Sequence, residues 1–167
     1  MNRLTYKIGV FTAILACLAL APLHAVERGK LPLATDLSRD AKLAREKKIP
    51  ILILFSTRGC AYCTRVREEI LIPTTYNADY DNKVIMVEVD SSNHSKLIDF
   101  EGKATTQAAF VAKNKVGLTP TVKFFDSQGH EVADPIVGLV TVDYYGGFLD
   151  QAIDASIAKI RGAIPTN

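Results

Sequence analysis

Two cysteines three positions apart, Cys60 and Cys63, are the residues of this chain best suited to chemistry. They follow an apolar run, Ile49 to Phe55, and open a stretch whose pattern predicts a helix over 60–71. Unpaired N–H groups and the dipole at a helix start favour a thiolate, and Arg58 adds positive charge nearby. Cys60 is therefore predicted to have a lowered pKa and to act as the nucleophile. Cys63, about one turn on, is predicted to resolve a mixed disulfide formed at Cys60.

Other chemistries for such a pair fit the sequence less well. Haem attachment needs a His directly after the second cysteine, where Thr64 stands. A structural zinc site needs four ligands, and no second Cys or His pair occurs at finger spacing. A copper-binding loop often has Met just before the pair, where Arg58 stands. A purely structural disulfide across so short a loop would stabilise the fold little, because it restricts the unfolded chain only slightly. Redox chemistry is favoured, while a copper carrier and a binding module with idle cysteines stay open as non-enzymatic alternatives.

The first 25 residues predict a secretory signal peptide, and hence a periplasmic protein. A basic start precedes a long apolar stretch from Ile8 to Ala21, and Leu23-His24-Ala25 is a candidate cleavage site. The uncharged run over 8–26 is 19 residues long, so an uncleaved N-terminal membrane anchor is the alternative. Lipid attachment at Cys17 is disfavoured because the apolar run continues past that cysteine.

The predicted mature chain, residues 26–167, is 142 residues long and can form one domain with its own core. We expect an N-terminal arm over 26–35 and the domain over 36–167. Export would leave 18 basic and 18 acidic residues, and this near-neutral balance argues against nucleic-acid binding. It would also remove Cys17, so the remaining two cysteines cannot form a disulfide-stapled scaffold.

Helical and strand patterns alternate along the predicted domain. A helix over 36–48, with Leu37, Ala41 and Ala44 on one face, precedes a strand over 51–55 that is apolar on both faces. The helix over 60–71 is expected to bury Ile70, to expose its charges, Arg67 included, and to end at Pro73. Further along, the patterns predict a strand over 84–89, a helix over 105–113, a strand over 122–125, an edge strand over 130–137 and a last helix after Thr141. The polar stretch over 91–103 has no clear assignment.

Taken together, these features resemble the thioredoxin superfamily over residues 36–161. The likeness rests on Cys60-Ala61-Tyr62-Cys63 after the first strand and on Thr119-Pro120-Thr121 before a later apolar strand. It implies an α/β thioredoxin-like fold, with a central mixed sheet of about four strands flanked by helices. It also implies that the Thr119–Pro120 bond is cis and lies against the cysteines, which leaves the Thr119 backbone free to pair with an incoming peptide. Ala61 and Tyr62 are then expected to join Thr119 and Pro120 in substrate binding, although Tyr62 could instead pack on its helix.

Residues 100–129, and Gly138 followed by a helix start over 144–148, look like the exported SoxW-type thioredoxins. That likeness implies a monomeric reductase of protein disulfides in the periplasm. Its partners would be client proteins and a membrane thiol relay, and its only cofactor would be the Cys60–Cys63 disulfide. The Ala-Tyr dipeptide and the Thr before Pro120 are also similar to periplasmic disulfide isomerases, so an oxidase or isomerase of the same fold is the alternative.

The chain departs from cytoplasmic thioredoxins in the motif, where Ala61-Tyr62 replaces their Gly-Pro, and at two places before it. Gly59 stands where those proteins have Trp, and Leu54 stands where they have a buried acid on the strand before the motif. Glu88 on the next strand is a candidate substitute for that acid, but an exposed strand residue is expected because Glu is seldom buried. His94 and His130 are expected to face solvent, and no metal site is predicted.

Overall fold

The computed structural model describes residues 28–139 and 141–162. The predicted signal peptide, with Cys17, and the first residues of the predicted arm lie outside the described residues. Within the described ranges, no helix combines the length and the apolar character that crossing a bilayer requires.

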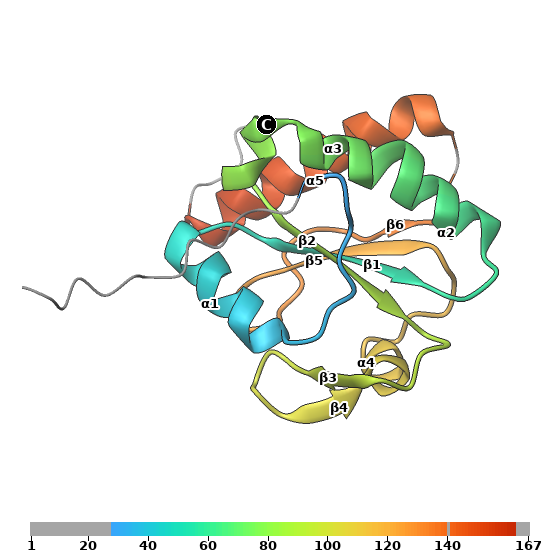
Figure 1. The fold of residues 1–167 in the computed structure, drawn as a ribbon. Coiled ribbons are helices and arrows are strands. Elements are labelled where there is room, and N and C mark those ends of the chain that lie inside the picture. The colour runs from blue at the N-terminus through green and yellow to red at the C-terminus, as the bar shows by residue number, and fades with distance from the viewer. Residues whose placement is uncertain (1–27, 140, 163–167) are drawn as a thin grey trace, which may run out of the picture.

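Four strands form the central sheet, in the order β2-β1-β5-β6 (Figure 1). β1 (Ile51–Ser56) pairs parallel with β2 (Ile85–Asp90) and antiparallel with β5 (Thr121–Phe125), which pairs antiparallel with β6 (Ile136–Val137). All six residues of β1 are buried, as expected for a central strand covered on both faces. The structure confirms the predicted α/β fold with a mixed sheet of four strands.

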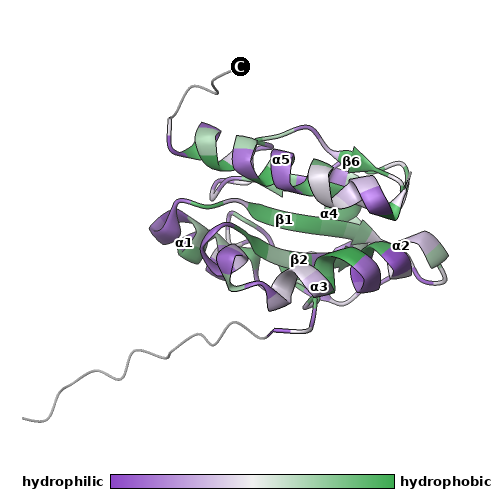
Figure 2. Cartoon of the chain, turned by 90° about the horizontal axis from the view of Figure 1, so that it is seen from above, coloured by the Kyte–Doolittle hydropathy of each residue, from purple (hydrophilic) through white to green (hydrophobic). Residues whose placement is uncertain are grey.

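Helices cover both faces of the sheet. α2 (Ala61–Arg65), the π-helical η1 (Val66–Leu71), α3 (Ile72–Tyr76) and α5 (Val142–Ile160) lie above it in Figure 1, whereas α4 (Gln107–Lys113) lies below. α1 (Leu37–Lys47) packs on the same face as α4, and a 3₁₀-helix, η2 (Ala78–Asn82), follows α3. Side chains of β1 alternate between the faces, so Leu52 and Leu54 join one core and Ile53 and Phe55 the other. Seen from above in Figure 2, β1 is hydrophobic along its length and is visible in the gap between α5 and the α2–α3 segment, which lie over the same face of the sheet.

The helix that carries the cysteines does not end at Pro73, contrary to the prediction. α2 passes into η1, where the Ile72 N–H bonds to the Arg67 carbonyl five residues back, and α3 follows directly. Pro73 lies in the first turn of α3, where the missing N–H of proline is tolerated. The widened π-helical turn therefore carries the chain past the proline.

Two other segments differ from the prediction. The unassigned stretch over 91–103 contains β3 (Lys96–Ile98), which forms a hairpin with β4 (Ala104–Thr106) directly after it; both strands are too short to show alternation. The helix predicted over 105–113 therefore begins two residues later than expected, at Gln107. The predicted strand over 130–137 is reduced to β6 and one isolated bridge at Glu131, because Pro135 cannot donate to the ladder. β6 does lie at the sheet edge, as the proline indicated.

The N-terminal arm runs beside β2 and protects its outer edge. The Glu88 N–H donates to the Pro32 carbonyl at 2.9 Å, and the Ala34 N–H donates to the Glu88 carbonyl at 2.8 Å. The Gln107 side-chain amide on α4 donates to the Ala34 carbonyl. The arm thus satisfies backbone groups that an open strand edge would expose.

Replacing Asp36, the N-cap of α1, with Ala is expected to lower the free energy of unfolding by about 1 kcal/mol at neutral pH. Asp36 Oδ1 accepts from the Ser38 hydroxyl at 2.6 Å and from the Arg39 N–H at 3.0 Å. The Ser38 bond, and then the Arg39 bond, lower the pKa of the Asp36 carboxyl. Because the folded-state pKa is below the unfolded one, this stabilisation is complete above the unfolded pKa and is lost as the pH falls through the folded pKa.

Chemical denaturation from neutral to strongly acid pH measures this effect. Asp36→Asn is the matched control, because Asn caps a helix without ionising and should remove only the acid-pH dependence. A gap between wild type and Asp36→Ala that stays constant down to strongly acid pH would contradict the assignment.

Candidate active site

Cys60 and Cys63 form a disulfide at the start of α2, with an S–S distance of 2.10 Å and a Cα–Cα distance of 5.2 Å. Cys60 is the N-cap of α2, and its Sγ accepts a hydrogen bond from the Cys63 N–H at 3.1 Å. Cys60 is partly exposed, whereas Cys63 is only 1% exposed. A partner can therefore reach Cys60, whereas Cys63 is shielded from solvent.

A tight turn sets the position of Cys60. The Cys60 N–H donates to the Thr57 carbonyl at 3.3 Å, and Gly59 between them has a φ of +75°, which favours glycine. The Arg58 N–H donates to the Ser92 hydroxyl oxygen at 3.2 Å, and the Ser92 hydroxyl donates to the Asp90 carboxylate at 2.7 Å. The loop is thereby attached to the end of β2.

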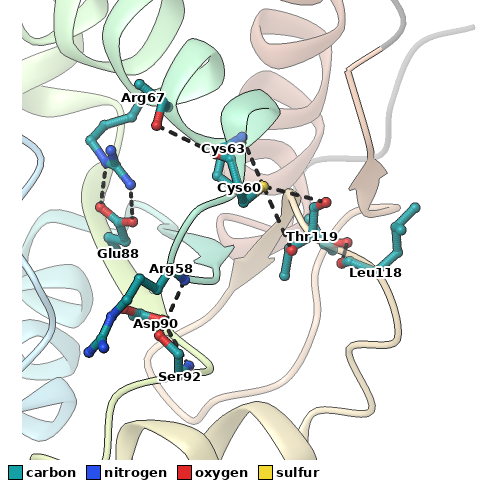
Figure 3. The surroundings of a disulfide bond; sticks show 11 residues. Arg58, Cys60, Cys63, Arg67, Glu88, Asp90, Ser92, Leu118 and Thr119 are labelled. Atoms are coloured by element: carbon teal, nitrogen blue, oxygen red, sulfur yellow. Dashed lines mark hydrogen bonds and ion pairs between the residues drawn. A yellow bond between two sulfur atoms is a disulfide. The ribbon is translucent and has the colours of Figure 1, made fainter.

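Thr119 lies directly against Cys60 of the disulfide (Figure 3). The Thr119–Pro120 peptide bond is cis, and Cys60 Sγ is 3.8 Å from the Thr119 carbonyl oxygen and 3.9 Å from Thr119 Oγ1. The pairing of β1 with β5, which places Phe55 opposite Thr121, brings together these two segments that are 59 positions apart. Pro120 is buried, whereas Thr119 is partly exposed.

Two large apolar side chains flank the site and remain exposed. Tyr62 is 59% exposed and Leu118 is 57% exposed, and Ala61 is exposed beside Tyr62. The Tyr62 ring is therefore not packed into the core. Sequence reasoning missed Leu118, although its place directly before Thr119-Pro120 was a signal that could have identified it.

The profile of the thioredoxin-like domain family matches residues 37–153. The chain belongs to this family. Similar solved structures include the DsbH oxidoreductase, at 18% identity and a TM-score of 0.57, with 81% of this chain and 92% of that chain covered. Thioredoxin Mala s 13 of Malassezia sympodialis is similar at 17% identity and a TM-score of 0.52, with 78% of this chain and 96% of that chain covered. Spinach chloroplast thioredoxin f is similar at 16% identity and a TM-score of 0.52, with coverage of 77% and 87%. No relative of the chain was found among curated protein sequences.

Two expectations near this thioredoxin-like site, on Glu88 and on Arg67, are wrong. Glu88 is buried, with 8% exposure, and its carboxylate accepts two hydrogen bonds from the Arg67 guanidinium, at 2.8 and 2.6 Å. Arg67, expected to face water, is itself partly buried, and its bond to Glu88 raises the pKa of the guanidinium. The reason is register: Glu88 pairs with Leu54, so both side chains lie on the sheet face that η1 covers.

The two histidines have no hydrogen bond to the cysteines or to Thr119 among the described residues. His94 and His130 are both exposed, as predicted, and His130 Nδ1 is 3.3 Å from Asp126 Oδ2. Among residues 28–139 and 141–162, no group of three or more His, Cys, Asp or Glu side chains is arranged to hold a metal ion.

Replacing Thr119 with Val is expected to lower the thiolate fraction of Cys60 in the reduced protein roughly fivefold at a fixed pH below its pKa. The Thr119 hydroxyl can donate to the Cys60 sulfur at 3.9 Å, and Val has no donor at this position. The pH dependence of the rate of alkylation by iodoacetamide measures the effect. Thr64→Val is the control, because the Thr64 hydroxyl donates to the Cys60 carbonyl oxygen and not to its sulfur. Equal alkylation profiles for wild type and Thr119→Val would exclude this role.

Proposed function

We propose that this thioredoxin-like protein is exported and reduces disulfides of client proteins in the periplasm, through a Cys60–Cys63 dithiol–disulfide cycle. The observation that carries the proposal is a partly exposed cysteine at a helix N-cap, bonded to a buried cysteine and in contact with Thr119. The signal-like pattern of the first 25 residues supports export. The likeness to SoxW-type thioredoxins supports the reducing direction.

In that direction, the Cys60 thiolate attacks one sulfur of a client disulfide. An S–S bond forms between Cys60 and the client, and the other client sulfur leaves as a thiolate that takes a proton from water. Cys63 then loses its proton and attacks Cys60 Sγ, which forms the Cys60–Cys63 disulfide and breaks the bond to the client. Two electrons pass from the dithiol to the client, and a membrane thiol relay would restore the dithiol.

Client binding would use the rim that surrounds Cys60. The Thr119 backbone, beside Pro120, would pair with an extended client segment next to the reacting disulfide. The exposed side chains of Ala61, Tyr62 and Leu118 would contact the residues on either side of it. A shallow exposed rim of this kind suits many clients better than a closed pocket suits one small molecule.

An oxidase or isomerase is the second candidate, and the Thr119 hydroxyl beside Cys60 favours it. A donor to the Cys60 sulfur stabilises the reduced thiolate and makes the disulfide a stronger oxidant. Equilibration with glutathione separates the candidates, since each tenfold change in the equilibrium constant corresponds to about 30 mV. A potential close to that of the strong periplasmic oxidants would overturn the reductase direction.

Trapping of the mixed disulfide tests the proposal directly. In Cys63→Ser the second step is blocked, so client proteins should remain attached to Cys60 and should be recovered from the cell envelope as reducible complexes. The double variant Cys60→Ser/Cys63→Ser is the control and should capture none. Mature protein that begins at Val26 would support export.

A copper carrier is the non-enzymatic alternative, and a direct titration tests it. The reduced protein is titrated with Cu(I) and its reduction of insulin is measured in parallel. Tight stoichiometric metal binding without insulin reduction would replace the proposed function. Reduction of insulin with weak or no metal binding would support it.

A further inference from the structure

One partner of a largely buried ion pair lies close to the cysteines in the chain, and the proposed exchange cycle makes no use of the pair. Nε and Nη2 of Arg67, on η1, donate to the two carboxylate oxygens of Glu88, on β2 (Figure 3). The side chains are 27% and 10% exposed, so water screens the pair poorly.

Stability alone is a weak reason for such a pair. Removing two charges from water has a large cost, and well-packed apolar residues in their place are often as stable or more stable. An apolar side chain is also compatible with this face of the sheet, because Leu54, the β1 partner of Glu88, is fully buried there. The position of the pair in the fold therefore points to an electrostatic role.

Cys63 is the group on which such a role would act. Arg67 follows Cys63 by four positions along the continuous segment of α2 and η1, and side chains so spaced are neighbours on a helix surface. Cys63 is 1% exposed, so its charge is poorly screened as well. The disulfide carries no charge, whereas the thiolate that attacks Cys60 does, so a nearby cation stabilises only the reduced, attacking form.

We propose that Arg67 and Glu88 are positioning residues for the dithiol: Glu88 holds the Arg67 guanidinium between η1 and β2, and the guanidinium stabilises the thiolate of Cys63. The inference rests on the proposed exchange cycle, in which Cys63 must lose its proton to resolve the mixed disulfide. Neither residue touches the client.

Other charged and titratable groups face the same region. Asp90 on β2 and Glu68 on η1 act on Arg67 through their charges, while Arg58 lies in the turn before Cys60. Tyr145 of α5 belongs to the same core as Leu54, and burial raises the pKa of its hydroxyl, so it stays neutral. Arg67 is thus the cation that is both close to Cys63 in the helix and held in place by a buried carboxylate.

The test measures the Cys63 thiol itself. In a full-length Cys17→Ser/Cys60→Ala background, Cys63 is the only cysteine, and the ultraviolet absorbance of its thiolate is followed against pH. Arg67→Met should lower the thiolate fraction about tenfold at a fixed pH below the pKa. Glu88→Gln should raise it by about the same factor, because the Gln oxygen still accepts from the Arg67 guanidinium while the opposing negative charge is lost. Arg67→Lys keeps the charge and should stay near the reference. Opposite shifts from the two halves of one ion pair are not expected of a purely structural contact.

The double variant Arg67→Met/Glu88→Met keeps the inference testable if a single variant fails to fold, because an apolar pair can replace a buried ion pair. Its thiolate fraction should be lower than the reference, since the cation is the nearer charge along the helix. An unchanged fraction in the double variant, or shifts of the same sign in both single variants, would overturn the inference.

These readouts need no client protein, so they separate the two proposals. If no client is trapped but the Cys63 thiolate fraction falls in Arg67→Met and rises in Glu88→Gln, the proposed function is contradicted and the electrostatic role of the pair stands. If clients are trapped but the thiolate fractions do not change in this way, only the role of Arg67 and Glu88 is contradicted. With both cysteines present, client release should slow several-fold in Arg67→Met and not in Glu88→Gln.

Discussion

Cys60→Ser is expected to lower the rate at which the reduced protein cleaves a protein disulfide by about a thousandfold or more. A serine hydroxyl is not ionised near neutral pH, so the attacking sulfur anion is lost completely. The buried Cys63 cannot replace it, because its 1% exposure leaves no path for a folded client to reach the sulfur. Turnover with insulin as the client, and a small aromatic disulfide as a second substrate, measures the effect.

Cys63→Ser is the matched comparison. It should also stop turnover, but it should leave the first attack by Cys60 close to its normal single-turnover rate. The double variant should be no slower in turnover than Cys60→Ser, because the two cysteines act as one unit. Retained turnover in Cys60→Ser, on either substrate, would show that the nucleophile is misassigned.

The sequence predicts well those parts of the active site that are formed by residues close together along the chain. The apolar run before the motif and the helical pattern after it predict a buried strand followed by a helix, and both begin where expected. Placing Thr119-Pro120 against Cys60 needed the family resemblance, because the contact depends on pairing between β1 and β5. No local pattern encodes that pairing.

The parts that sequence reasoning missed depend on partners far along the chain. Glu88 was expected to be exposed because most Glu residues are, and that tendency fails here because Arg67 provides a matching guanidinium 21 positions earlier. Gln107 is a polar residue at a helix start, for which the sequence indicates no special role, yet it is fully buried. The burial of such residues can be predicted only when the register of the sheet and the path of the N-terminal arm are known.

Gln107→Leu is expected to lower the free energy of unfolding by about 2–4 kcal/mol, with each newly unpaired buried group costing about 1–3 kcal/mol. The Gln107 amide donates to the Ala34 carbonyl of the arm, and its oxygen accepts the Asp90 N–H at 3.2 Å. Leu fills similar space but satisfies neither group. Chemical denaturation measures the loss, and Gln151→Leu on the exposed face of α5 is the control, with an expected change within about 0.5 kcal/mol.

The same substitution should also act at a distance on the exchange site. Asp90 accepts from Ser92, and Ser92 accepts the Arg58 N–H in the turn that presents Cys60. Loss of the hydrogen bond from the Asp90 N–H to Gln107 should therefore make that turn more mobile, as well as the N-terminal arm. Hydrogen exchange should then rise at Ala34 and at Arg58 together. If stability falls while exchange rises only at the arm, Gln107 anchors the N-terminal segment but does not support the active-site loop. If stability is unchanged, the two hydrogen bonds of the Gln107 amide do not stabilise the fold.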